Sequence, residues 1–158
     1  MKNLRTTVCC VCFMLYSLCL AAQNNQSIPI NEPDRNKPKM FQHFPDFIPV
    51  NIENLDNLLS SPAGRSINAN LSTETPLQFE GQVVSASSKY GNSISSVVIR
   101  STNFNGATLT ISRITNSDGT ISYAGRIISF QHGDLYELQK RENRIFLVKR
   151  NFYDLINE

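Results

Sequence analysis

Tryptophan is absent from this sequence, and cysteine is confined to one end of it. The four cysteines all lie within the first 19 of 158 residues. Residues 20–158 therefore have no means of forming a disulfide, a cysteine nucleophile, a zinc–cysteine site or an iron–sulfur cluster. A domain formed there must depend on its hydrophobic core. The lack of tryptophan also disfavours a carbohydrate-binding site, since tryptophan is the usual platform on which sugars stack.

A membrane-spanning segment is missing as well. The apolar run Val8–Leu20 has 13 residues, whereas a helix that crosses a bilayer needs about 20. Lys2 and Arg5 precede this run and the small residues Ala21 and Ala22 follow it, an order that is typical of a secretory signal peptide. We therefore predict a signal peptide over residues 1–22, export to the periplasm or the extracellular space, and no membrane span once the signal is removed.

Two alternatives for this N-terminal run are open. It could be a buried helix of the folded domain, although its charge, apolar core and small-residue exit follow the order of a signal peptide. Cys19 could instead carry a lipid anchor, but bacterial lipidation needs a small residue before the cysteine, and Leu18 occupies that position. With the predicted cleavage every cysteine is lost, so the exported protein is expected to be free of disulfides.

Excess charge of either sign is missing from the exported part. Removing Lys2 and Arg5 from the 15 basic residues leaves 13, against 13 acidic residues. Nucleic-acid binding rests on a basic excess, so no nucleic-acid partner is expected. The two histidines, His43 and His132, are too few for a three-histidine metal site, and the usual nucleotide, zinc-protease and calcium motifs are absent. We expect no metal and no cofactor.

The first part of the exported chain is polar and rich in proline. Residues 23–39 predict a flexible tether, because Pro29, Pro33 and Pro38 exclude a helix interior. Residues 40–75 are expected to form an aromatic-proline arm followed by a short amphipathic helix over residues 51–59. Asn25 and Asn70 begin glycosylation sequons, which matter only in a eukaryotic secretory pathway.

Three phenylalanines recur at every third position of the arm. Phe41, Phe44 and Phe47 alternate with Pro45 and Pro49, a pattern that fits an extended polyproline-like segment with one apolar edge. The rings are expected to pack on the protein's own domain, because isolated aromatic rings are seldom left in water. The alternative is a docking segment for a protein partner.

From residue 76 onward the pattern is that of β-structure. Leu109 and Ile111 alternate with polar residues, and the turn signals Asn105–Gly106 and Asp118–Gly119 separate the apolar segments. Residues 76–158 therefore predict a mainly β domain, an antiparallel meander of about six strands. Either an open sheet covered by the 51–59 helix or a small closed barrel satisfies this pattern.

Three arginines stand at equal intervals in the predicted strands. Arg100, Arg113 and Arg126 are 13 residues apart, and aligned hairpins would place them in a row that binds an acidic ligand or a peptide carboxylate. The Asp118–Gly119 turn would set Arg113 opposite Tyr123 and allow cation–π stacking. The alternative is solvent-facing charge, because a slip of one residue in the register sends the side chains to different faces.

His132, Gly133 and Asp134 invite a catalytic hypothesis. With Ser129 upstream, the histidine and the aspartate suggest a nucleophilic triad and thus a small hydrolase. A turn explains the same residues, because glycine supplies a positive φ and aspartate bonds the local backbone. No element like the G-x-S-x-G nucleophile elbow is present, so we predict no catalytic residue.

Two segments resemble small exported proteins of Bacteroidota-type bacteria that have no assigned activity. The segments are ISRITNSDGTISYAGRIISFQHGDLYEL, residues 111–138, and FLVKRNFYDLINE, residues 146–158. Some secreted bacterial peptidases carry comparable β-rich segments ahead of the catalytic domain, so the resemblance implies a free-standing relative of such an accessory segment. It carries over no active-site residue.

These observations predict an exported, non-enzymatic β domain that works by binding a protein or peptide partner. The candidate binding residues are Arg100, Arg113, Arg126, Tyr123, Phe41, Phe44 and Phe47. An inhibitor-like or propeptide-like partner of a secreted peptidase is one alternative. The hydrolase that uses His132 and Asp134 is the other.

Overall fold

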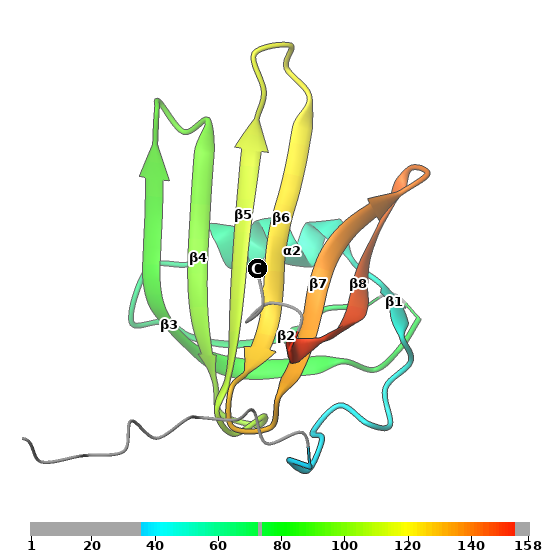
Figure 1. The fold of residues 1–158 in the computed structure, drawn as a ribbon. Coiled ribbons are helices and arrows are strands. Elements are labelled where there is room, and N and C mark those ends of the chain that lie inside the picture. The colour runs from blue at the N-terminus through cyan, green and yellow to red at the C-terminus, as the bar shows by residue number, and fades with distance from the viewer. Residues whose placement is uncertain (1–35, 73, 154–158) are drawn as a thin grey trace, which may run out of the picture. The chain divides into compact units, whose positions relative to one another are not determined.

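The computed structural model describes residues 36–72 and 74–153. They form one antiparallel sheet of eight strands that curls into a half-barrel, and one short helix lies across the inner side of the central strands (Figure 1). The elements are β1 (Phe47–Pro49), α2 (Ile52–Leu59), β2 (Ser66–Asn70), β3 (Gln78–Lys89), β4 (Ile94–Ser101), β5 (Ala107–Thr115), β6 (Ile121–Ser129), β7 (Asp134–Arg141) and β8 (Arg144–Asn151). Their order in the sheet is β1-β8-β7-β6-β5-β4-β3-β2.

The predicted mainly β fold and its short helix are confirmed, but the predicted number of strands is too low. The six strands expected after residue 76 correspond to β3–β8, which follow one another as a meander. The prediction missed β1 and β2, which lie at the two edges of the sheet. β1 has three residues and includes Pro49, and β2 reads Ser-Ile-Asn-Ala-Asn. β1 has the aromatic and β-branched residues of a strand but is too short and ends in proline, and β2 has a single β-branched residue among polar and small ones, so neither gives a strong strand signal.

The sheet is neither fully open nor closed, because its two edges meet at one end only. Val50 forms an isolated bridge with Ser72, and the Asn51 amide donates to the Leu71 carbonyl at 3.0 Å. Beyond this junction β1 ends and the chain turns into α2. The helix therefore occupies the seam that a closed barrel would fill with strand pairing.

Helix α2 begins at a well-formed cap and buries one face. The Asn51 side chain accepts a hydrogen bond from the Asn54 amide at 3.3 Å, which satisfies one free donor of the first turn. Leu55 and Leu58, three positions apart, are buried against the face of the sheet that we call the inner face. Inner-face residues of the central strands, such as Ile111, are fully buried. The helix thus completes the hydrophobic core.

The aromatic arm packs on its own domain through two of its three rings. Phe41 is 1% exposed and forms edge contacts with Phe44, Phe104 and Tyr136, at centroid distances of 5.1–6.0 Å. Phe47 is 48% exposed.

The exposure of Phe47 contradicts the expectation that the three rings share one edge. Phe41–Phe44 form a turn, with the Phe44 amide bonded to the Phe41 carbonyl at 3.1 Å, whereas Phe47 starts β1. Side chains alternate in a strand, so the next residue, Ile48, faces the core and Phe47 faces outward. There the guanidinium of Arg141 lies over its ring at 4.5 Å.

The predicted signal peptide and most of the predicted tether lie outside the described residues. The last part of the tether segment contacts the domain. Lys37 donates to the Phe130 carbonyl at 3.1 Å, and Lys39 donates to the Gly133 carbonyl. No helix among the residues described is long and apolar enough to cross a membrane.

Candidate functional site

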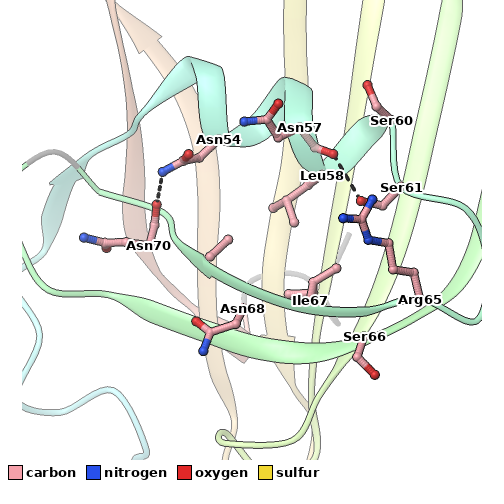
Figure 2. Close-up of a pocket in the computed structure, with 11 residues that line it drawn as sticks. Asn54, Asn57, Leu58, Ser60, Ser61, Arg65, Ser66, Ile67, Asn68 and Asn70 are labelled. Carbon is pink, nitrogen blue, oxygen red and sulfur yellow. Dashed lines mark hydrogen bonds between the residues drawn. The ribbon is translucent and has the colours of Figure 1, made fainter.

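A polar pocket lies between helix α2 and strand β2. Its volume is about 500 Å³, within the range of about 300–1,000 Å³ that ligand pockets occupy. Figure 2 shows the residues that line it: Asn54, Asn57, Leu58, Ser60, Ser61, Arg65, Ser66, Ile67, Asn68, Ala69 and Asn70. The helix, the loop after it and the strand are consecutive in the chain, so one helix–loop–strand segment builds the whole site.

The lining combines a small apolar floor with a ring of uncharged polar groups. Leu58, Ile67 and Ala69 are the apolar members, and all three touch the hydrophobic core. Arg65 is the one ionised group among the lining residues. A pocket of this kind favours a ligand that offers hydrogen-bonding groups along its length.

The wall formed by β2 is an unpaired strand edge. The Val83 amide donates to the Arg65 carbonyl at 2.9 Å, and the Leu71 amide donates to the Leu77 carbonyl at 3.0 Å. Since backbone groups alternate in direction along a strand, the odd-numbered residues of β2 bond β3. The backbone N–H and C=O groups of Ser66, Asn68 and Asn70 point away from β3, toward the helix.

One of these outward groups already has a partner. The Asn54 side chain donates to the Asn70 carbonyl at 2.5 Å, which ties the first turn of α2 to the end of β2 (Figure 2). Within the described part of the chain, the backbone N–H and C=O of Ser66 and Asn68 have no hydrogen bond. The pocket thus presents four free backbone groups on one wall.

The other end of the pocket is closed by the chain itself. The loop from Ser60 to Arg65 joins α2 to β2, and it is fixed by the Gly64 amide, which donates to the Val83 carbonyl at 2.7 Å. The hydroxyls of Ser60 and Ser61 donate back to helix carbonyls at 2.9 and 3.1 Å. The side-chain donor left at this end is the Arg65 guanidinium, while the Asn57 side-chain amide points away from it in Figure 2.

Two of the residues predicted to bind a ligand, Arg113 and Tyr123, contact the helix. The register sets Arg113 opposite Tyr123, as the Asp118–Gly119 turn predicted. Both side chains reach Asp56 on α2: the Tyr123 hydroxyl donates to the carboxylate at 2.8 Å, and the Arg113 guanidinium lies at 3.5 Å. Burial of the ring and the bond to Asp56 raise the pKa of Tyr123 to about 12.

The predicted row of three arginines does not form. Arg113 lies on the inner face, whereas Arg126 and Arg100 pair with Thr110 and Thr108 on the opposite face. Side chains alternate between the two faces with a period of two, and the interval of 13 residues is odd. Arg113 therefore lies on the opposite face from Arg100 and Arg126. Arg100 and Arg126 are exposed.

Ser129, His132 and Asp134 lie close together, but they do not form a relay that a substrate could reach. The Ser129 hydroxyl lies 3.0 Å from His132 Nδ1, yet Ser129 is fully buried. The Asp134 carboxylate accepts the Met40 amide at 2.5 Å, so it fixes the arm. Gly133 adopts φ +59, as the turn interpretation expected.

Sequence reasoning missed the pocket, because its main feature is a backbone edge. Asn54, Asn57 and Arg65 belong to no recognisable motif, and the sequence does not predict a strand after the helix that ends at Leu59. The signal available was the alternation of Ile67 and Ala69 with polar residues, which is the pattern of a half-buried strand. It was too short to stand out.

The chain matches no protein family, no curated protein and no solved structure. Within residues 36–72 and 74–153, no group of three or more histidine, cysteine, aspartate or glutamate side chains is placed to hold a metal ion. The pocket between α2 and β2 is the candidate functional site.

Proposed function

We propose that this protein is an exported, non-enzymatic binding domain that takes up an extended polypeptide segment between α2 and β2. The segment adds to the free edge of β2 as a further strand. Main-chain hydrogen bonds supply the affinity in this mode of recognition, and the side chains on one face supply the specificity.

The observation that carries this proposal is the free edge inside a pocket. Ser66 and Asn68 together offer two N–H donors and two C=O acceptors in the alternating order that a β-strand needs. Exposed strand edges are commonly covered or blocked by charge, yet this one has a pocket of about 500 Å³ in front of it. A sugar or a planar cofactor would not match the spacing of these groups, whereas a peptide backbone does.

The alternative of an inhibitor-like or propeptide-like partner of a peptidase is a special case of the same mode, with the peptidase supplying the segment. The hydrolase alternative gains no support from Ser129, because this hydroxyl is fully buried.

Hydrogen exchange and peptide capture test the proposal together. In the free protein the amides of Ile67 and Ala69, which bond β3, should exchange slowly and those of Ser66 and Asn68 rapidly. A pool of N-terminally labelled hexapeptides of randomised sequence should yield an enriched subset on the full chain, and that subset should slow the exchange of the Ser66 and Asn68 amides.

A proline at the edge provides the matched variant. Asn68→Pro removes an outward N–H and blocks strand addition without removing a bond to β3. Ala86→Pro makes the same change on the free outer edge of β3, away from the pocket. Capture should be lost in the first variant and kept in the second. No enrichment on the unmodified protein, or equal enrichment on Asn68→Pro, would refute the proposed function.

A further inference from the structure

We infer, resting on the proposed function, that the segment bound between α2 and β2 ends there. The pocket receives a free C-terminus, which runs antiparallel to β2 and places its carboxylate at Arg65 and Asn57. Three features of the pocket lead to this inference: its closed end, the charge at that end and the direction of β2.

The closed end excludes a segment that continues straight through. The loop from Ser60 to Arg65 connects α2 covalently to β2, and its backbone is fixed at both sides. The Gly64 amide bonds Val83 at 2.7 Å, and the Arg65 amide bonds the Pro62 carbonyl at 3.3 Å. An internal segment that pairs with β2 would run into this loop, whereas a chain terminus can stop in front of it.

At the opposite end the chain itself covers the edge of β2, because the Asn51 amide donates to the Leu71 carbonyl at 3.0 Å and Val50 bridges Ser72. The side-chain amide of Asn54 donates to the Asn70 carbonyl at 2.5 Å, and a backbone N–H of the ligand can replace this donor. Since Val50 and Asn51 cover the edge of β2 from Leu71 onward, the rest of the ligand chain turns out of the sheet toward solvent before it reaches Leu71.

The charge at the closed end selects the carboxyl terminus. In Figure 2 the Arg65 side chain reaches from the start of β2 across the closed end of the pocket toward Ser61, and within the described part of the chain this exposed side chain has no hydrogen bond or ion pair. The side-chain amide of Asn57 also has no hydrogen-bond partner among the described residues. A guanidinium binds a carboxylate through two parallel hydrogen bonds, and it repels a terminal ammonium. A C-terminus is therefore favoured over an N-terminus.

The direction and the length of the bound segment follow from β2. The strand starts next to Arg65 and runs from Ser66 to Asn70, so a segment that ends at Arg65 must run antiparallel to it. Five strand residues span about 14 Å at the usual rise per residue. The pocket thus reads roughly the last four or five residues of its partner.

The pocket floor adds a preference for one side chain. A ligand residue opposite Ile67 lies on the same face of the extended sheet as Ile67 and Ala69, and it faces Leu58 of the helix. We expect an apolar residue at that position and polar or small residues beside it.

Two peptide pools test this inference on the full chain. Both are N-terminally labelled randomised hexapeptides; one has a free C-terminal carboxylate and the other a C-terminal amide. The free-acid pool should be enriched, and amidation of the recovered peptides should weaken binding about tenfold. Arg65→Gln should lower the affinity for the free acid by a similar factor and remove the difference between acid and amide, whereas Arg126→Gln, on the outer face, should change neither.

The outcomes separate the two proposals. Equal capture of both pools, with exchange protection of Ser66 and Asn68, would overturn the C-terminal inference and leave the proposed function in place. Peptides whose binding depends on an internal glutamate or aspartate rather than on the terminus would also overturn it. Capture of neither pool would refute both.

Discussion

Tyr123 on β6 donates its hydroxyl hydrogen to the Asp56 carboxylate on α2 at 2.8 Å, although the two residues are 67 positions apart. Arg113, the neighbour of Tyr123 across the β5–β6 pair, approaches the same carboxylate at 3.5 Å. This pairing fixes the solvent side of α2 over the sheet, while Leu55 and Leu58 hold its buried side. Since the helix is one wall of the pocket, Tyr123 and Arg113 position the site without lining it.

Replacing Asp56 should therefore weaken the fold and the site together. We expect Asp56→Ala to lower the free energy of unfolding by about 1 kcal/mol, since it removes one charged hydrogen bond and one half-exposed ion pair. It should also reduce peptide capture. Urea unfolding measures the first effect. Glu53→Gln, which removes a charge from the same helix, is the control and should change stability by only a few tenths of a kcal/mol. Equal effects of the two variants would show that the contact with Tyr123 and Arg113 does not anchor the helix.

The raised pKa of Tyr123 predicts a loss of stability at high pH. A tyrosine in the unfolded chain ionises near pH 10, whereas burial and the bond to Asp56 hold the pKa of Tyr123 at about 12. The protonated form is favoured in the folded state, so this stabilisation is complete below about pH 10 and is lost as the pH rises through 12. The stability difference between the unmodified protein and Tyr123→Phe should be constant up to about pH 9.5 and shrink above it. Urea unfolding over this range checks the sign, and a constant difference to pH 12 would contradict it.

The elements predicted best from sequence are those with local patterns. Leu109 and Ile111 alternate with polar residues, and Asp118–Gly119 fixes the turn that follows, so the strand, its buried face and its register were accessible from the sequence. The Arg113–Tyr123 pair followed from that turn. The role of this pair in anchoring α2 could not be predicted, because Asp56 belongs to a helix far away in sequence. No local pattern shows which helix side chain will contact which residue of the sheet.

The features missed from sequence depend on pairing partners. β2 is a strand because Ile67 and Ala69 bond Gly81 and Phe79 of β3, not because its own residues favour one. The pocket exists because only one edge of β2 is paired. The wrong prediction for Phe47 has a similar origin, since pairing of Phe47 with Val148 of β8 replaces the threefold spacing of the arm with the twofold alternation of a strand.

The two rings Phe41 and Phe47 should differ strongly in their contribution to stability. Phe41→Ala leaves a cavity among Phe44, Phe104 and Tyr136 and should cost about 3–5 kcal/mol. Phe47→Ala removes a half-exposed ring and a contact with Arg141, so its cost should stay below about 1 kcal/mol. Thermal unfolding of the two variants measures the contrast. Similar midpoints would mean that the arm does not pack on the domain through Phe41.

Two asparagines of α2 should affect peptide capture in opposite directions. Asn54 closes the far end of the pocket through its bond to the Asn70 carbonyl at 2.5 Å. A ligand strand that pairs along the whole of β2 must replace that bond, so part of the binding free energy is spent on breaking it. Asn54→Ala removes the competing donor, while the backbone amide of residue 54 keeps its bond to the Asn51 cap. We expect this variant to bind the free-acid peptides several-fold more tightly.

Asn57 lies one helical turn further on, toward the end of the pocket closed by the loop, and in the proposed complex its side-chain amide turns from the position drawn in Figure 2 to donate to the terminal carboxylate. Asn57→Ala should weaken capture several-fold, because a charge-assisted hydrogen bond is lost. Asparagine and alanine are exchanged at both positions, so the effect of the substitution on helix propensity is the same in each variant. Fluorescence anisotropy with one peptide recovered from the free-acid pool gives the two affinities directly. If both variants weaken binding equally, Asn54 contacts the ligand rather than competing with it, and the ligand strand does not extend to Asn70.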